Sequence, residues 1–322
     1  MSKLEVIQPG VLSQFQDLGR YGASQLGLSQ GGAVDLHAYC WANRLLGNDM
    51  DAPVLEILLG ACAFKAHSDS LMAIAGAQMN ATIDGVAVKN WSSFIVKKGQ
   101  VLKLGYATQG LRGYIAIKSG FFSSLFLNSS STVIRNNIGG LARVGESFGH
   151  GNKLESGDFF SARSSQPVIE TPQTVTQKYI PSYLDHIEVR VIPSYQYEEF
   201  SDAAIAAFFN HTFTITNQSD RMGIRLSGPA IECDLKGIIS EGIALGSIQI
   251  PPDGQPIILL NDRQTLGGYP KIGCICKTDI SQLAQAKAGT TIRFVATDFE
   301  QSSEKWIDFS RFFGLEYHRS AE

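Results

Sequence analysis

The sequence lacks the features that define several common classes of protein. No apolar run reaches the ~18 residues that span a membrane, and the N-terminal MSKLEVIQPG has no apolar core of a signal peptide. The 27 basic and 30 acidic residues leave a net charge of −3, which gives no electrostatic basis for binding nucleic acid or an anionic membrane. We therefore expect a cytoplasmic protein that has neither of these as a partner.

Cysteine and histidine patterns are equally uninformative about metals and disulfides. Five cysteines, an odd number in 322 residues, argue against a secreted disulfide framework. The six histidines have no ligand spacing, and Cys274 and Cys276 do not form a C-x-x-C pair, so we expect no metal site. The sequence contains no GxxxxGK[ST], GxGxxG, HExxH or GxSxG motif, so no common catalytic signature assigns a reaction.

Glycine, by contrast, is abundant, with 32 residues in 322 against an average of ~7%. Short apolar runs separated by turn residues fill the segments 54–134 and 186–298, and Asp84-Gly85 between two runs is typical of a hairpin. Helical patterns are confined to three short segments, 33–47, 195–209 and 279–287. The sequence therefore predicts a mainly β fold, with β-barrel domains and a few short helices.

The length predicts about two domains. The segment 161–185, rich in Pro, Ser, Thr and Gln, is the best linker candidate. We predict an N-terminal β-rich domain with one helix over 1–165, a linker over 166–185, a β-barrel domain over 186–299 and a tail over 300–322.

Two arginines stand four residues apart in the polar segment 217–228, NQSDRMGIRLSG. Guanidinium groups at Arg221 and Arg225 can be directed at one carboxylate or phosphate, and Asn217 adds an amide. A solvated turn with ordinary surface charges explains the same spacing, so the spacing alone does not separate a binding site from a turn.

A longer polar block follows the apolar strand IILL, in the loop NDRQTLGGYPK at 261–271. The paired glycines Gly267 and Gly268 let backbone N–H groups approach a ligand closely. The polar side chains that project from this loop are Asp262, Arg263, Gln264, Thr265, Tyr269 and Lys271, and Gln249 stands on a preceding strand. A site on a strand-borne loop is one interpretation, and a hairpin loop made soluble by charge is the other.

A third polar stretch, 14–35, places Asp17, Arg20 and Asp35 among five glycines. It is either a ligand-facing loop over the mouth of a barrel or an irregular N-terminal cover.

These stretches resemble a known family, the biotin-dependent carboxyltransferase family, in the branch that holds the C subunit of 5-oxoprolinase and the allophanate hydrolase subunit 2-like proteins. The similarity is carried by FQDLGRYG at 15–22, GGAVD at 31–35, ANRLLGN at 42–48, SDRMGIRLSGP at 219–229 and the whole of 240–273. LNSSST at 127–132 stands where the family usually has a Gly and an Arg before Ser-Thr.

The resemblance implies a cyclophilin-like β-barrel, in two related copies. It also implies the C subunit of an ATP-dependent 5-oxoprolinase, which acts with partner subunits A and B to open 5-oxoproline to L-glutamate. The chain would help to activate the lactam by phosphorylation, with ATP and Mg²⁺ bound together with one of the partners, and would be inactive alone.

On this interpretation we expect Asp262, Gln264 and Lys271 to be catalytic residues. The expected substrate-binding residues are Asn217, Arg221, Arg225, Gln249, Thr265, Gly267, Gly268 and Tyr269. The arginines and the lysine would bind an anion, the amide side chains would hydrogen-bond the lactam, and Asp262 would orient the substrate or a metal nucleotide. Asp17, Arg20 and Asp35 form a second candidate cluster.

Two alternatives remain open at this point. The chain could be the carboxyltransferase component of a biotin-dependent urea or amide carboxylase, with biotin carried on another protein because this chain has no Met-Lys-Met segment. It could also be a non-catalytic regulatory module that binds a homologue of the B subunit.

Overall fold

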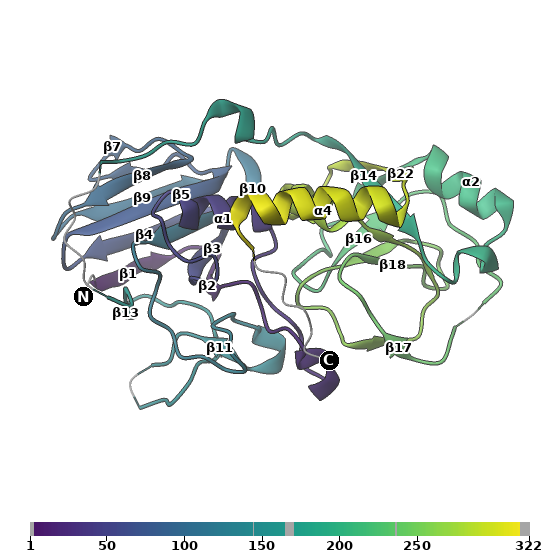
Figure 1. The fold of residues 1–322 in the computed structure, drawn as a ribbon, viewed down its shortest axis with the longest axis horizontal. Helices are drawn as coiled ribbons and strands as arrows, with labels where there is room; N and C mark the ends of the chain where they lie inside the picture. The colour runs from purple at the N-terminus through teal and green to yellow at the C-terminus, as the bar shows by residue number, and fades with distance from the viewer. Residues whose placement is uncertain (1–2, 144, 165–170, 236, 316–322) are drawn as a thin grey trace. The chain divides into compact units, whose positions relative to one another are not determined.

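A computed structural model of the chain describes residues 3–143, 145–164, 171–235 and 237–315 (Figure 1). The chain forms two compact units, residues 1–21 with 31–183 and residues 22–30 with 184–322. The division differs from the predicted one because 22–30 groups with the second unit and 171–183 with the first. Residues 166–170 of the predicted linker and 316–322 of the predicted tail lie outside the described residues.

The first unit contains two antiparallel sheets with a shared apolar core. The six-stranded sheet has the order β13 (Phe159–Ser161), β1 (Lys3–Pro9), β4 (Gly60–Ala66), β9 (Val101–Tyr106), β6 (Thr82–Ile83), β7 (Val86–Ala87). The five-stranded sheet has the order β2 (Leu12–Gln16), β3 (Val54–Leu58), β10 (Gln109–Ile117), β5 (Ser70–Gln78), β8 (Ser92–Val96). Edge-to-face contacts among Phe15, Phe64, Phe121 and Phe160 join the two sheets in the core.

The structure confirms the hairpin and the helix predicted in the first unit, although the helix has different bounds. Asp84 and Gly85 take left-handed φ values of 48° and 85° and turn the chain from β6 to β7, as the hairpin prediction requires. Helix α1 (Leu36–Arg44) is shorter than the predicted 33–47, and the Asp35 carboxylate caps it by accepting from the Ala38 N–H at 3.0 Å. The strand predicted at 132–134 is wrong, because Val133 makes only an isolated bridge to Ile138.

Small elements complete this unit. They are η2 (Ile134–Asn136), β11 (Gly139–Gly140), β12 (His150–Asn152) and η3 (Gln177–Tyr179).

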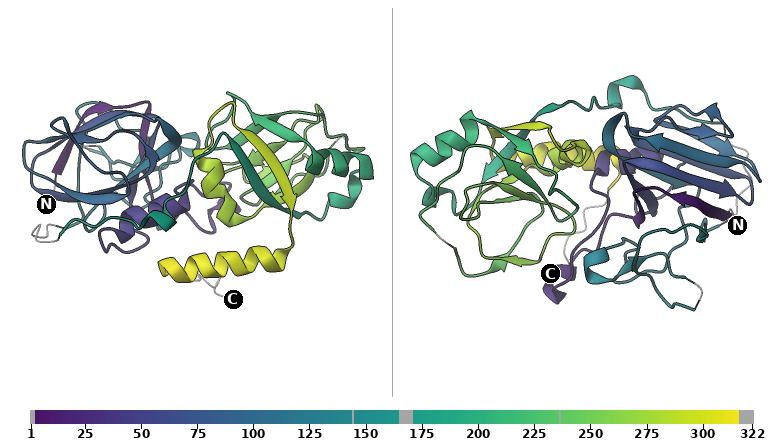
Figure 2. Two further views of the ribbon diagram at one scale, coloured as in Figure 1. Left: turned by 90° about the horizontal axis from the view of Figure 1, so that it is seen from above. Right: turned by 180° about the vertical axis from the view of Figure 1, so that it is seen from behind.

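The second unit is built on a closed seven-stranded barrel, which Figure 2 shows from two further sides. The order is β14 (His186–Pro193), β21 (Lys271–Ile275), β18 (Ser247–Gln249), β19 (Ile257–Leu259), β16 (Gly223–Ser227), β15 (Thr212–Ile215), β22 (Thr291–Ala296). Buried Val191, Phe213, Ile224, Ile258 and Phe294 alternate along these strands with residues of the outer face. The predicted mainly β fold with a few short helices is confirmed, and this unit is one of the two predicted barrels. Among the described residues, the strands of the first unit form two separate sheets and not a second closed barrel.

Helices of the second unit are shorter than predicted at two places. The segment 195–209 splits into η4 (Tyr197–Glu199) and α2 (Asp202–Asn210), and 279–287 into η5 (Lys277–Asp279) and α3 (Ile280–Gln285). Asp279 stands at the N-cap position of α3, but its carboxylate makes no capping bond there and pairs with Arg190.

The remaining elements of this unit are η1 (Ala23–Leu26) and α4 (Phe299–Phe313), the yellow helix of Figure 2 in the predicted tail. Within the described residues, no helix is long and apolar enough to cross a membrane.

Candidate functional site

Four residues form a row across the outer face of the barrel. The strand register pairs Arg225 with Ile257, Ile257 with Gln249, and Gln249 with Lys271. Paired residues on neighbouring strands point to the same side of a sheet. The adjacent row (Ile224, Ile258 and Ile248) is fully buried and faces the interior of the barrel. The register therefore places three of the predicted site residues on one outer face.

A two-stranded flap covers one end of this row. β17 (Glu241–Gly242) pairs with β20 (Leu266–Gly267), and the pairing extends through bonds from the Ile238 N–H to the Gly268 carbonyl (2.8 Å) and from the Ile243 N–H to the Thr265 carbonyl (3.1 Å). Beneath it, Gln249 and Lys271 are only 2% and 4% exposed. Side chains on the outer face of the barrel are thus buried by the flap.

Glycine at position 267 is what lets the flap lie so close. A methyl group on Gly267 would come within 2.6 Å of Gln249 Nε2 and 2.4 Å of Ile243 Cδ1. The close approach predicted for the glycine pair therefore exists, and the partner it meets in this structure is Gln249.

Lys271 is held by an ion pair and by the segment 194–196. Its ammonium pairs with the Glu241 carboxylate, and its backbone N–H donates to Gln196 Oε1 at 2.9 Å. The other end of the Gln196 amide donates to Glu241 Oε1, also at 2.9 Å, so one side chain bridges the backbone of Lys271 and its counter-ion. The Ser194 hydroxyl donates to the Lys271 carbonyl.

The charge state of Glu241 follows from these contacts. Burial raises its pKa, but hydrogen bonds from Lys271, Tyr195 and Gln196 outweigh burial and hold the pKa below its usual value. Glu241 is therefore held as a carboxylate, and the Tyr195 ring lies 5.5 Å from Lys271 Nζ. Glu241, Gln196 and Tyr195 were not predicted as site residues, because no local pattern connects 194–196 with 241 and 271.

Gln249 carries an unmet hydrogen-bond donor. Its Nε2 is buried and makes no hydrogen bond within the part of the chain that the structure describes. Most buried side-chain polar atoms in proteins are satisfied, so an unmet donor in a covered polar layer indicates a place for an acceptor from outside the chain. We call the group formed by Gln249, Lys271, Glu241, Gln196 and Arg263 the flap site.

Arg263 lies at the base of the flap. Its guanidinium donates to the carbonyls of Ile243 (3.0 Å) and Leu260 (3.2 Å), and burial lowers its pKa. It makes no ion pair with a carboxylate among the described residues. Arg263 was not among the expected site residues, although it stands in the middle of the polar block.

Asp262 and Arg221 form a buried ion pair at the end of β16 and β19. Arg221 Nε and Nη2 each donate to one carboxylate oxygen of Asp262 at 2.9 Å, and the two side chains are 9% exposed. The Ser29 hydroxyl donates to the carbonyls of Asp262 (3.2 Å) and Arg263 (2.8 Å). Both carboxylate oxygens of Asp262 are thus engaged within the protein, which favours a structural role for the pair.

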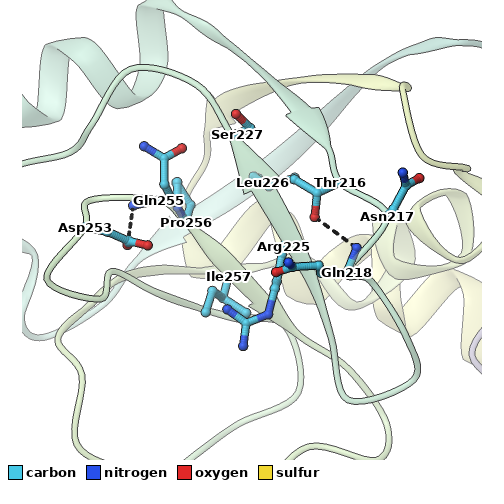
Figure 3. A pocket seen from close by; sticks show the side chains of 10 residues that line it. All are labelled: Thr216, Asn217, Gln218, Arg225, Leu226, Ser227, Asp253, Gln255, Pro256 and Ile257. Atoms are coloured by element: carbon cyan, nitrogen blue, oxygen red, sulfur yellow. Dashed lines mark hydrogen bonds between the residues drawn. The ribbon is translucent and has the colours of Figure 1, made fainter.

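The other expected site residues separate into two groups. Gln264, Thr265 and Tyr269 lie on the loop that connects β19 to β21, and Tyr269 is exposed. Asn217 and Arg225 line a separate hollow on the same barrel (Figure 3).

The second predicted cluster lies in the first unit, where Asp17 and Arg20 both bond to one segment. The Asp17 carboxylate accepts from the hydroxyls of Ser129 (2.7 Å) and Ser131 (2.6 Å), and Arg20 donates to carbonyls of the same segment, including Phe126 at 3.1 Å. The Ser-rich run that departs from the family pattern is therefore the segment that wraps Asp17 and Arg20. Asp35 is instead the cap of α1, so the three residues do not form one site.

Fold and sequence together define the class of this protein. The family model described as "Carboxyltransferase domain, subdomain A and B" matches residues 26–296, and the chain belongs to that family. This confirms the resemblance drawn from the sequence.

Within the family, the chain is similar to proteins named as the C subunit of 5-oxoprolinase. It is 36% identical over 311 residues to that of Escherichia coli (strain K12), with 96% of each chain covered. It is 32% identical over 302 residues to that of Haemophilus influenzae, with 94% of this chain and 93% of the relative covered.

The barrel fold recurs in larger proteins. The structure of the K. lactis urea amidolyase superposes with a TM-score of 0.87 at 25% identity, covering 96% of this chain but 20% of that one. The structure of TTHA0988 gives a TM-score of 0.81 at 30% identity, covering 92% of this chain and 55% of that one. The same fold is therefore found both as a separate polypeptide and as part of longer chains.

Proposed function

We propose that the chain is the C subunit of an ATP-dependent 5-oxoprolinase and acts with partner subunits A and B to open 5-oxoproline to L-glutamate. The observation that carries this proposal is the 36% identity to the E. coli protein over 96% of both chains. We assign the lactam to the flap site, which the flap must uncover to admit a ligand. Among the described residues this site offers an unmet amide donor at Gln249 and a guanidinium without a carboxylate partner at Arg263.

The chemistry of the substrate explains what such a site has to do. Resonance in the lactam makes its carbonyl carbon a poor electrophile. A fixed donor at the carbonyl oxygen stabilises the charge that develops there during attack, and Gln249 Nε2 is placed to be that donor. Ring opening leaves an amine nitrogen that must gain a proton, and Lys271, the register neighbour of Gln249, is an ammonium able to donate one. The substrate carboxylate would bind Arg263.

The polar residues around the flap offer little to bind ATP. Arg221 and Lys271 are each neutralised by a carboxylate, which leaves Arg263, whereas a triphosphate needs several unpaired cations or a metal. Within the described residues, no group of three or more His, Cys, Asp or Glu is arranged to hold a metal ion. We therefore place ATP and Mg²⁺ with one of the partners and derive no phosphoryl transfer from this chain, which we expect to be inactive alone.

The test is release of glutamate from 5-oxoproline and ATP by the chain mixed with subunits A and B. We expect release only when all three are present. Gln249→Leu, which keeps the volume and removes the donor, should lower kcat/KM by about 10²-fold, as for loss of one oxyanion donor. Gln25→Leu, at an exposed glutamine of the same unit, is the matched control. Glutamate release without this chain would contradict the proposal, and a normal rate for Gln249→Leu would remove Gln249 from the site.

Carboxyl transfer from biotin to a urea-like amide is the second candidate, because the chain is also similar to proteins named urea amidolyase and putative urea carboxylase. The Saccharomyces cerevisiae urea amidolyase is 28% identical over 317 residues, which cover 93% of this chain and 17% of the relative. Biotin is a cyclic urea that carries the transferred carboxyl group when bound, and the unmet Gln249 donor fits its ureido oxygen. Incorporation of labelled bicarbonate into urea by the chain and a biotinylated partner would support this candidate, and labelled glutamate from 5-oxoproline would not appear.

A further inference from the structure

A hollow of about 370 Å³ lies on the outer face of the barrel, beside the flap site but separate from it. Figure 3 shows Arg225 next to Ile257, with Ser227 further along the same strand and Asp253 on the neighbouring turn. The volume lies within the range of small-molecule sites.

The walls of this hollow are fixed by hydrogen bonds. Asp253 Oδ1 accepts from the Gln255 N–H at 3.0 Å and shapes the turn before β19. The Gln255 amide clamps Gly228, accepting from its N–H at 2.9 Å and donating to its carbonyl at 3.2 Å. The Gln218 N–H donates to the Thr216 hydroxyl at 3.3 Å. The hollow is therefore formed before any ligand arrives.

Two opposite charges face the hollow without contacting each other. The guanidinium of Arg225 makes no hydrogen bond or ion pair within the described ranges, and Asp253 Oδ2 likewise accepts none there. A cation on β16 and an anion on the turn before β19, both without a partner among the described residues, line one hollow and are complementary to a small molecule that carries both charges. A guanidinium binds a carboxylate through two parallel N–H groups, and a carboxylate oxygen accepts from an ammonium.

We propose that the hollow binds a free α-amino acid, with its carboxylate on Arg225 and its ammonium at Asp253. Ser227, on the same face of β16 two residues from Arg225, and Asn217 have side chains that make no hydrogen bond among the described residues and are available to a polar amino-acid side chain.

This site is distinct from the flap site. Arg225 and Gln249 are two strands apart in the register, roughly 10 Å along the sheet, and Gln249 lies under the flap. A small lactam cannot reach both. The inference therefore does not depend on the proposed enzymatic activity, although L-glutamate, the product of that activity, belongs to the proposed ligand class.

The test uses the ¹⁵N-labelled chain alone, without its partners or ATP, and follows backbone amides during titration. L-Glutamate should shift the amides of Ser227 and Gln255. 5-Oxoproline, which lacks the ammonium, and inorganic phosphate should shift them only at much higher concentration.

Arg225→Gln and Asp253→Asn should each weaken glutamate binding about tenfold or more. Asp253→Asn keeps the oxygen that accepts from Gln255, so the turn is retained. Arg293→Gln removes an exposed outer-face arginine that pairs with Glu188 and should leave binding unchanged.

Absence of shifts with glutamate, or equal binding of phosphate, would overturn the proposal. Equal loss in Arg293→Gln would show that the binding is non-specific and would overturn it as well. None of these outcomes depends on whether the reconstituted complex hydrolyses 5-oxoproline.

Discussion

Replacing Asp262 by alanine should destabilise the barrel strongly, because it leaves the buried Arg221 guanidinium without its counter-ion. The two groups are joined by two bonds of 2.9 Å and are 9% exposed at their side chains. Removal of one partner of such a pair costs about 3–5 kcal/mol, whereas an exposed pair is worth less than about 1 kcal/mol. Because Arg221 and Asp262 are buried, we expect the cost of breaking a buried pair and not that of an exposed one.

The assay is native-state hydrogen exchange at the amides of β16 and β19, which the Arg221–Asp262 pair terminates. A loss of 3–5 kcal/mol corresponds to a fall in protection of roughly 10²- to 10⁴-fold. The double variant Arg221→Met, Asp262→Leu replaces the ion pair by apolar side chains of similar volume and should recover most of the loss. Matched amides in β5 of the first unit serve as the internal control.

A loss below about 1 kcal/mol in Asp262→Ala would refute this reasoning, since it would mean that the pair is solvated like a surface ion pair. A double variant as unstable as the single one would also refute it. If Asp262→Ala abolished 5-oxoproline hydrolysis but left hydrogen-exchange protection unchanged, Asp262 would instead act in the reaction.

Three further changes test the flap site and the first unit. Gly267→Ala should push the flap away from Gln249, because the new methyl would lie 2.6 Å from its Nε2, and we expect faster exchange of flap amides and a loss of about 1–3 kcal/mol. Gln196→Ala removes its bonds to the Lys271 N–H and to Glu241 and should lower the free energy of unfolding by about 1–3 kcal/mol in urea titrations. Gln196→Glu should give no smaller loss, because an anionic oxygen would then face the Glu241 carboxylate where the amide nitrogen donates. Burial lowers the pKa of His37 from 6.5 to about 4, so between those values the unfolded state binds a proton that the native state does not. Stability should therefore fall by up to about 3 kcal/mol as the pH drops through this window, and a His37→Gln variant that kept the full slope in tryptophan-detected unfolding would contradict the assignment.

Local signals predicted much of the fold. The alternation of apolar residues placed β14, β15 and β22 within one or two residues, and the Asp-Gly pair placed the β6–β7 turn. β16 and β21 were not predicted, because their strands lie inside segments dense in polar and glycine residues. Short strands in such segments are specified by pairing with distant neighbours, which one local window does not contain.

The candidate site, like the fold, was predicted from the sequence only in part. Gln249 and Lys271 stand 22 positions apart, and only the register of β18 with β21 makes them neighbours. The loop composition pointed to the region, but the partners of Lys271 come from Gln196 and Glu241, which no spacing rule connects. The sequence likewise did not predict the ion pair between Asp262 and Arg221, because each residue was interpreted separately as a ligand-binding group.

The order in which the chain passes through the two units limits where it can be divided into fragments. Residues 22–30 belong to the barrel unit although they interrupt the sequence of the first, so the polypeptide crosses between the units three times. A fragment that begins at residue 184 would lack Ser29, whose hydroxyl donates hydrogen bonds to the backbone carbonyls of Asp262 and Arg263. A gene rearrangement that transplanted only the contiguous C-terminal stretch would therefore deliver all seven barrel strands without the segment 22–30 that belongs to the same unit.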